Sequence, residues 1–413
     1  MIRELQISNY KSLYQLTLDV GRFNVLIGEN GCGKSNVLEA IVFAGAAAAG
    51  KLDNEFLVSR GIRVTEPKLM RAAFTDKSET ESIQIKIKYN NLETIEEYLI
   101  EHTNEAYAEW IRMQSDDVAK FESISSLTRD ELKGIISVEE WVTGQKLIST
   151  IKPLAQLALS FKEIQAVLTK DEILFQKKLE PIATYFTALR DDEAKLQRFL
   201  IYSPENTALR NFSKEGQIEP LGINGEGLLK LLKVIQSKSP EQLDEIIAGL
   251  QLFDWFEDIN IPKELSSLED KVTITDRYLT MAFDQRSANE GFLFVLFYFA
   301  LMVSDDTPKI FAIDNIDASL NPKLCTKLIK ELVRLAKKYD KQVFVTTHNP
   351  AILDGIDLGD DEQRLLVLSR NRQGYTRVKR IDLKDKPVSS TNEELKLSEA
   401  FLRGYLGGLP KGF

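Results

Sequence analysis

The stretch GENGCGKS, from Gly28 to Ser35, fits the pattern G-x-x-x-x-G-K-[ST] without a gap. It follows a short apolar run and precedes a helical pattern, which is the context that a phosphate-binding loop requires. Glycines let backbone N–H groups surround a phosphate, Lys34 can reach the β- and γ-phosphates, and the Ser35 hydroxyl can ligate Mg²⁺. We therefore predict a site for ATP and Mg²⁺. Its cofactor-binding residues are Asn30, Gly31, Cys32, Gly33, Lys34, Ser35 and Asn36.

Two side chains of this loop carry further expectations. Lys34 is expected to face solvent when no nucleotide is bound. Cys32 occupies a variable position of the motif and is expected to be a small filler. The alternative is a thiol activated by the helix N-terminus, and it stays open because that position can lower a thiol pKa.

A second apolar run, IFAID, ends at Asp314, where a strand-end carboxylate can bind Mg²⁺ through water. The alternative role for Asp314 is to cap a turn. Asn321 and Pro322 then predict the start of a helix. Four leucines share one face of that helix and are expected to pack on the sheet: Leu324, Leu328, Leu332 and Leu335.

A third apolar run, KQVFVTTHNP, ends at His348, one helix after the Asp314 strand. The ends of parallel strands line the ligand crevice of open α/β sheets. A neutral imidazole there can contact a γ-phosphate or the attacking water. A purely structural histidine is the alternative.

In this order, the motifs resemble the ABC-type ATPase heads of the RecF, SMC and OLD (overcoming-lysogenisation-defect) group. LQISNYKSL resembles the first strand and turn of that group, GENGCGKSN its phosphate loop, FAIDNIDASLNP its second carboxylate strand, and VTTHNP its switch histidine. The matching motifs occupy residues 1–50 and 275–350. The implied fold is α/β: a P-loop ATPase head with a mixed sheet flanked by helices, interrupted by a mostly helical insertion.

The resemblance also implies that ATP lies between two subunits, with a signature loop from the second subunit at a helix N-terminus. The segment RSANEGFLF is the candidate, with Ser287, Asn289 and Gly291 as its binding residues. An ordinary N-cap and helix start is the alternative. No clear equivalent of the glutamine loop is found.

Many ATPases of this kind place a glutamate after the second-strand aspartate, whereas this chain has Asn315. An amide is a poor general base at neutral pH, although it can orient water. Asp317 corresponds to a second acidic position of the group and can supply a carboxylate. We therefore expect slow hydrolysis, with Asp314, Asn315, Asp317 and His348 as catalytic residues and Ser35 and Asp314 as metal ligands.

The composition limits the alternatives. The chain has 413 residues, 43% of them hydrophobic and 28% charged, with a net charge of −9. Nucleic acid would therefore need a local basic patch. Two cysteines and two histidines argue against zinc and disulfides and favour a reducing cytoplasm. The charged N-terminus predicts no signal peptide, and no apolar run is long enough to cross a membrane.

The element order suggests three parts: an N-terminal ATPase lobe (1–91), a helical insertion (92–270) and a C-terminal ATPase lobe (271–413). The leading hypothesis is an ATP-gated switch that forms a homo-oligomer and controls a separate effector. By resemblance, compact antiphage ATPases such as those of the Septu and PARIS systems work beside a nuclease. Too few residues follow His348 for a nuclease domain here.

Three alternatives stay open. One is a DNA-repair ATPase that contacts DNA directly in the RecF or SMC manner, so nucleic acid remains a candidate partner. A second is a transporter subunit, which the missing glutamine loop disfavours. The third is a scaffold that binds ATP without hydrolysing it.

Overall fold

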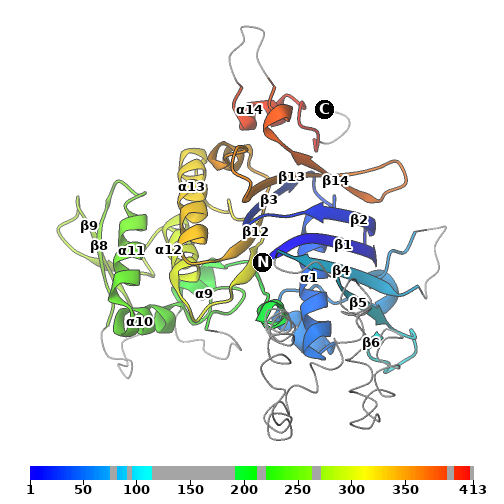
Figure 1. The fold of residues 1–413 in the computed structure, drawn as a ribbon. Coiled ribbons are helices and arrows are strands. Elements are labelled where there is room, and N and C mark those ends of the chain that lie inside the picture. The colour runs from blue at the N-terminus through cyan, green and yellow to red at the C-terminus, as the bar shows by residue number, and fades with distance from the viewer. Residues whose placement is uncertain are drawn as a thin grey trace, which may run out of the picture.

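The computed structural model describes residues 1–74, 81–90, 95–113, 191–211, 220–262, 271–387 and 395–409. Two sheets enclose a central helix, and further helices cover the outer face of the larger sheet (Figure 1). The sequence prediction of an α/β fold with a mixed sheet is confirmed.

The larger sheet has six strands in the order β14-β13-β3-β12-β11-β7. Five of them run parallel, and β14 is antiparallel to β13. β3, β11 and β12 are buried along their whole length, as expected for parallel strands covered on both faces. The strands are β3 (Phe23–Gly28), β7 (Ile201–Tyr202), β11 (Ile310–Ile313), β12 (Gln342–Thr347), β13 (Gln363–Arg370) and β14 (Thr376–Ile381).

The second sheet is antiparallel, in the order β2-β1-β4-β5-β6. Its inner side chains, helix α1 (Lys34–Ala49) and one face of the larger sheet form a single apolar cluster. α1 lies between two sheets, and from Ala40 onward its residues are apolar on all sides, as expected for a buried helix. The strands are β1 (Ile2–Tyr10), β2 (Leu13–Asp19), β4 (Ile83–Tyr89), β5 (Ile95–Glu101) and β6 (Ile111–Met113), and short helices α2 (Asn54–Ser59) and α3 (Pro67–Met70) lie between β3 and β4 in the chain.

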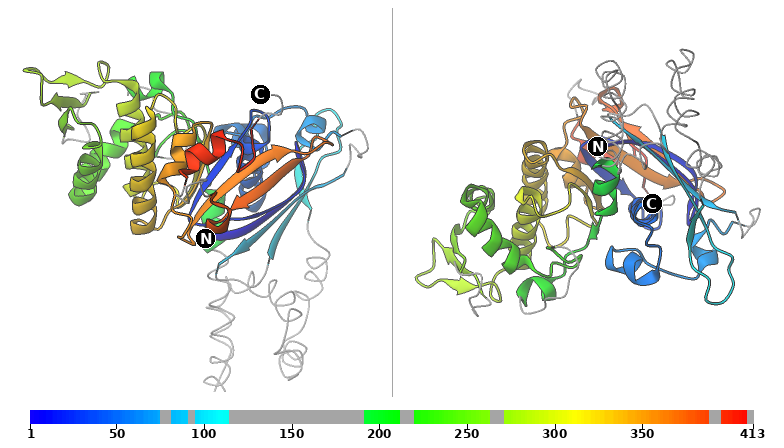
Figure 2. Two further views of the ribbon diagram at one scale, coloured as in Figure 1. Left: turned by 90° about the horizontal axis from the view of Figure 1, so that it is seen from above. Right: turned by 60° about the horizontal axis from the view of Figure 1, so that its bottom comes forward.

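Helices α12 (Glu290–Val303) and α13 (Pro322–Lys338) cover the other face of the larger sheet (Figure 2). The outer layer comprises α10 (Leu228–Lys238) and α11 (Pro240–Leu250). α13 begins as predicted: Asn321 accepts a hydrogen bond from Leu324 N, and Pro322 occupies the first turn. Its four predicted leucines are buried. α9 (Asn206–Arg210) and a small sheet of β8 (Phe256–Asn260), β9 (Thr273–Asp276) and β10 (Phe283–Asp284) complete this side.

The C-terminal part continues with two 3₁₀ helices, η3 (Pro350–Gly355) and η4 (Leu383–Asp385), and ends with helix α14 (Leu397–Leu402). The apolar residues of α14 and of the turn that follows it lie in two environments. Phe401 and Leu406 join the main core, whereas Leu402 and Tyr405 are more than half exposed. Among the described residues, no helix is long and apolar enough to cross a membrane.

Two strands within the predicted insertion, β5 and β7, belong to the two ATPase sheets. β5 pairs with β4, and β7 pairs with β11. The mixed charged and apolar pattern of Ile95–Glu101 had suggested a helix, but pairing with β4 makes it a strand. A large part of the expected helical insertion, residues 114–190, lies outside the described residues. The division into three parts stays a prediction. If β5 and β7 are counted with the ATPase lobes, the predicted insertion becomes shorter.

Candidate nucleotide site

The predicted phosphate loop joins the end of β3 to the start of α1. Gly33 has a φ of 107°, in the region that favours glycine. A Cβ there would lie 2.8 Å from the Ser12 hydroxyl and closer still to the Thr376 hydroxyl. Gly31 also has a positive φ, of 74°. The motif glycines are therefore required by backbone conformation and by the close approach of neighbouring strands.

Lys34 is buried, and the expectation that it faces solvent is wrong. Only 6% of the residue is exposed, and Nζ donates to the carbonyls of Gly28 and Glu29, at 3.0 Å each. Burial lowers the pKa of this ammonium, while the nearby Cys32 and Asp314 act in the opposite direction. The loop carbonyls thus hold the ammonium inside the loop.

The Cys32 side chain is fully buried, and this burial raises its thiol pKa. A buried thiol with a raised pKa is a weak nucleophile. This environment supports the filler role over the activated one. Cys32 also contributes its carbonyl, which accepts a hydrogen bond from the Thr376 hydroxyl at 2.8 Å.

Ser35 and Asp314 meet at the carboxyl ends of β3 and β11. Ser35 Oγ donates to Asp314 Oδ2 at 3.3 Å, and the Thr346 hydroxyl donates to Asp314 Oδ1. A hydroxyl beside a carboxylate is an oxygen donor set that suits Mg²⁺. No cluster of three or more His, Cys, Asp or Glu residues that could hold a metal occurs in the described part of the chain. A metal here would therefore take its remaining ligands from phosphate and water.

The two candidate water-orienting residues in the turn after Asp314 differ in exposure and in side-chain hydrogen bonding. Asn315 has a positive φ of 54° and an exposed side chain, and its backbone N–H donates to Thr346 Oγ1 at 2.9 Å. Asp317 is partly buried, and its Oδ1 accepts a hydrogen bond from the Thr347 hydroxyl at 2.6 Å. The carboxylate of Asp317 is therefore held in place.

His348 follows β12 directly and is exposed. Partial burial of the ring and the positive charge of Lys34 lower its pKa, against the opposing charges of Asp317 and Asp314. The imidazole is therefore neutral at pH 7. The structure thus brings His348 into electrostatic contact with the predicted phosphate loop and both aspartates.

The candidate signature loop lies before α12. Asn289 caps this helix by accepting a hydrogen bond from Phe292 N at 2.8 Å, so the ordinary N-cap is present. Ser287 is exposed. Gly291 is buried, and a Cβ on it would lie 2.8 Å from the Ser319 carbonyl. A side chain at Gly291 would therefore disturb the turn after Asp314 in its own chain.

The sequence interpretation missed several residues that shape the site. Arg370 donates to the Gly31 carbonyl at 2.8 Å, and Ser12 joins Thr376 and Asn36 by hydrogen bonds of 2.7 and 2.8 Å. Arg210 donates to the Ala288 carbonyl at 2.7 Å and so supports the candidate signature loop. These are common polar residues that lie far apart in the sequence, so no local pattern indicates that they act together.

A hollow of about 440 Å³ lies beside the phosphate loop. It is lined by basic side chains, among them Lys11, Arg63 and Arg370. Glu39 forms ion pairs with Lys11 and Arg63 and so neutralises part of this charge. The hollow is large enough for part of a nucleotide.

A family model described as "AAA domain, putative AbiEii toxin, Type IV TA system" matches residues 23–354. The chain belongs to this family. The matched range of this AAA-domain protein begins at β3 and ends within η3, so it includes the phosphate loop, Asp314 and His348. P-loop ATPases as a class use ATP and Mg²⁺.

The fold of this AAA-domain protein is similar to that of a solved SMC head. An SMC head bound to the C-winged helix domain of ScpA is 13% identical, covers 93% of this chain and 98% of its own, and superposes with a TM-score of 0.52. The SMC head domain from Thermotoga maritima is also 13% identical, covers 92% and 99%, and has a TM-score of 0.42. The fold is that of an SMC-type ATPase head. No curated protein matches the chain.

Proposed function

We propose that this chain is an ATP-binding and slowly hydrolysing switch that dimerises, or assembles further, through ATP. The observation that carries the proposal is the approach of Ser35 Oγ to the Asp314 carboxylate, at 3.3 Å, beside the buried ammonium of Lys34. A hydroxyl, a carboxylate and an ammonium at the carboxyl ends of parallel strands of one sheet are the groups that a nucleotide triphosphate with Mg²⁺ requires.

Each group has a distinct role in this proposal. Ser35 and Asp314 would hold Mg²⁺, which neutralises charge on the phosphate oxygens. Lys34 would exchange its loop carbonyls for β- and γ-phosphate oxygens. The backbone N–H groups of the loop would bind phosphate at the N-terminus of α1, where the helix dipole favours an anion. The predicted residues Asn30, Gly31, Cys32, Gly33 and Asn36 contribute this backbone or border it.

Slow hydrolysis follows from the two residues after Asp314. The Asn315 amide cannot accept a proton from water, although it can orient water. Asp317 retains a free carboxylate oxygen, since one oxygen accepts the hydrogen bond from Thr347. We assign Asp317 as the general base and neutral His348 as a hydrogen-bonding partner of the γ-phosphate or water.

Dimerisation is supported by the exposure of the loop that precedes α12. Ser287 and Asn289 would contact the γ-phosphate held by a second copy, with Gly291 keeping the helix start close to the turn after Asp314. ATP would thereby join two copies. Its slow turnover would set the lifetime of the dimer.

We further propose that the switch controls a separate effector in antiphage defence, with a nuclease as the model partner. The family description, a putative toxin of a toxin–antitoxin system, and the resemblance to the Septu and PARIS ATPases support this step. The SMC head of similar fold is bound to a domain of another protein, ScpA, which supports partner control by such heads in general.

Titration of the purified chain with ATP, with and without DNA, tests the proposal while mass and phosphate release are followed. We expect ATP binding, a dimer with a non-hydrolysable analogue, and slow phosphate release that DNA does not change. Absence of ATP binding would overturn the switch. ATP binding without a change in mass would remove the dimer alone.

A further inference from the structure

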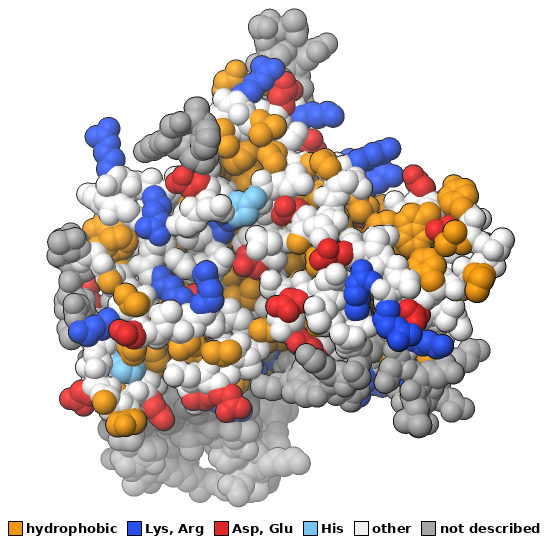
Figure 3. All heavy atoms as spheres, turned by 180° about the vertical axis from the view of Figure 1, so that it is seen from behind, with side chains coloured by type: hydrophobic (Ala, Val, Ile, Leu, Met, Phe, Trp, Pro, Cys, Tyr) orange, Lys and Arg blue, Asp and Glu red, His pale blue; other side chains and the backbone are white. Residues whose placement is uncertain are grey.

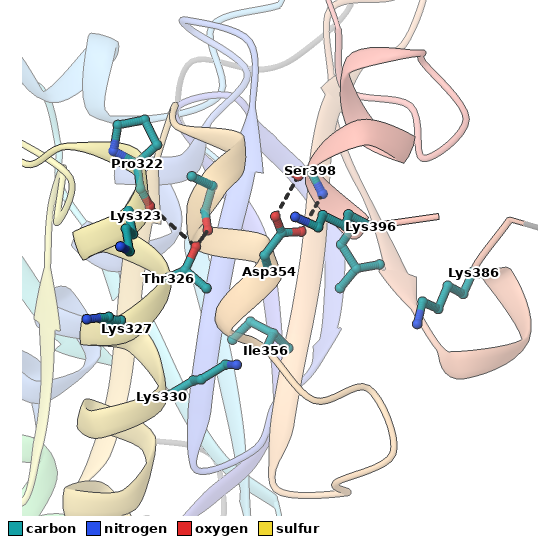
Figure 4. A pocket seen from close by; sticks show the side chains of 12 residues that line it. Pro322, Lys323, Thr326, Lys327, Lys330, Asp354, Ile356, Lys386, Lys396 and Ser398 are labelled. Atoms are coloured by element: carbon teal, nitrogen blue, oxygen red, sulfur yellow. Dashed lines mark hydrogen bonds between the residues drawn. The ribbon is translucent and has the colours of Figure 1, made fainter. Parts of the chain in front are cut away.

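A groove with a volume of about 690 Å³ lies between α13, η3 and the segment that leads into α14. Five lysines line it: Lys323, Lys327, Lys330, Lys386 and Lys396. Figure 4 shows the three lysines of α13 on one side and Lys386 and Lys396 on the other, with Ile356 between them. We call this feature the lysine groove. It lies on different residues from the nucleotide site described above.

The two halves of α13 differ in how their basic residues are neutralised. In the C-terminal half, Arg334 and Lys338 pair with Glu245, and Lys337 pairs with Asp360. In the N-terminal half, no ion pair with Lys323, Lys327 or Lys330 occurs within the described residues, and all three are exposed.

The lysines in the N-terminal half of α13 are electrostatically unfavourable for the helix. The N-terminus of a helix carries a partial positive charge, so cations in the first turns are unfavourable there. Lys323 lies in the first turn of α13, directly after Pro322, and no acidic residue accompanies it in that turn. An anion bound in the lysine groove would relieve this repulsion.

The lining of the lysine groove also contains apolar side chains, namely Pro322, Ala351, Ile356 and Leu397. Its carboxylate, Asp354, accepts hydrogen bonds from the backbone N–H and the hydroxyl of Ser398, at 2.9 and 2.7 Å. The groove thus offers cations at its sides and apolar contacts between them. Its ligand should combine negative charge with apolar groups.

We propose that the lysine groove docks an acidic, amphipathic segment of the effector protein. Grooves for single-stranded nucleic acid combine basic residues with aromatic side chains on which bases stack. Among the residues that the structure describes, no aromatic side chain or arginine lines this groove. The net charge of −9 also disfavours a long polyanion. The lysines of α13 lie within eight residues, from Lys323 to Lys330, or about 10 Å of helix, which matches two turns of a bound helical segment.

The lysine groove is connected to the nucleotide site through its own walls. α13 follows the turn that begins at Asp314, and η3 begins two residues after His348. The Thr326 hydroxyl joins the two walls by donating to the Ala351 carbonyl at 2.8 Å. A segment docked here would respond to movements of both turns. The inference therefore deepens the proposed function, on which it rests for the identity of the partner.

The test uses the full chain and a short fluorescent peptide with Glu and Leu at helical spacing. Fluorescence anisotropy compares this peptide with a scrambled peptide of the same composition and with single- and double-stranded DNA of similar charge. We expect the amphipathic peptide to bind best. The double variant Lys327→Glu/Lys330→Glu should weaken binding about tenfold or more, because two attractions become repulsions.

The matched control, Lys88→Glu/Lys271→Glu, changes the net charge equally at exposed positions outside the groove and should bind within about twofold of wild type. Equal effects of the two variants would overturn the proposal. The proposal would also be overturned if the wild type bound DNA but not the peptide, and only the groove variant lost DNA binding. The ligand of the groove would then be nucleic acid. Peptide binding is also measured without nucleotide and in Lys34→Ala. Docking in the groove can therefore be judged even if the proposed ATP-dependent switch is wrong.

Discussion

The phosphate loop and the candidate signature loop differ in how far their own chain completes them. The phosphate loop is enclosed: Thr376 and Arg370 bond its carbonyls, and Lys34 is buried within it. The loop before α12 presents Ser287 to solvent on the side of the molecule that carries β8 and β9. Figure 3 shows that hydrophobic side chains gather at that edge. One loop is therefore enclosed by its own chain, whereas the other, in the proposed function, would act on a nucleotide held by a second copy.

The largest expected effect concerns the chemistry between these loops. Asn315→Glu should raise the rate of phosphate release, but by less than the roughly 10²–10⁴-fold that a general base contributes, because Asp317 already serves as base in the proposed mechanism. Asp317→Asn should abolish turnover while ATP binding persists. Steady-state phosphate release measures both, and the rate per chain should rise with protein concentration if the second loop comes from another copy. A phosphate-release rate per chain that does not depend on protein concentration would contradict a contribution of the second loop from another copy.

If Asn315→Glu is no faster and Asp317→Asn no slower, neither residue governs the reaction. His348 and Glu290 would then be the next candidates for activating water. The double variant separates the two roles, because Asn315→Glu should restore turnover to Asp317→Asn if either carboxylate suffices.

Lys34→Ala should weaken ATP binding about a hundredfold or more, because the ammonium forms charge-assisted hydrogen bonds to two phosphates. Calorimetric titration measures the affinity. Thermal unfolding must accompany it, since Lys34 also bonds the Gly28 and Glu29 carbonyls. Lys88→Ala is the control for net charge. A folded Lys34→Ala protein that binds ATP as tightly as wild type would show that the phosphate-loop assignment is wrong.

Ser287→Glu should weaken ATP-dependent association about tenfold while leaving ATP binding by the single chain unchanged, because its carboxylate would repel phosphate held by the other copy. Sedimentation with a non-hydrolysable analogue measures this. Ser287 is a better position than Gly291, where any side chain would contact the Ser319 carbonyl of the same chain. If the analogue raises the mass of the wild type and of Ser287→Glu equally, the model in which ATP lies between two copies is wrong.

The pH dependence of turnover should follow His348. Its pKa is lowered from 6.5, so the ring stays neutral at pH 7 and turnover should be constant from pH 8 to about 6.5 and decline below that. The same shift means that the folded state binds its proton less readily than the unfolded state. The stability contribution is present above pH 6.5 and is lost as the pH falls through the lower folded value. His348→Gln should remove the decline in a pH–rate profile. A decline that remains would assign it to another group.

The smallest effect is expected for Thr376→Val, which keeps the shape of the side chain but removes its hydrogen bonds to Cys32 and Ser12. Loss of about 1–3 kcal/mol of unfolding free energy is expected, because buried polar partners remain without a bond. Urea denaturation measures it, with exposed Thr65→Val as the control. Equal stabilities would mean that the phosphate loop does not depend on this contact.

The sequence allowed prediction of the parts that short patterns specify. The phosphate loop, the strand before Asp314 and the helix start at Asn321 each depend on neighbouring residues, and the structure forms all three elements. Their functional roles stay predictions. Lys34 could not be placed, because its position depends on carbonyls that only the folded loop brings together. Ile95–Glu101 was misjudged because its partner strand, not its own composition, decides its conformation.

The position of β3 in the larger sheet has a consequence for the synthesis of the protein. β3 pairs with β12 on one side and β13 on the other, more than 300 residues later in the chain. A ribosome therefore releases the nucleotide loop long before its supports, Arg370 and Thr376, have emerged. Such distant pairings form slowly and late. An unfinished polypeptide would accordingly lack the enclosed phosphate loop. Under the proposed function, it could neither hold ATP nor act on an effector during translation.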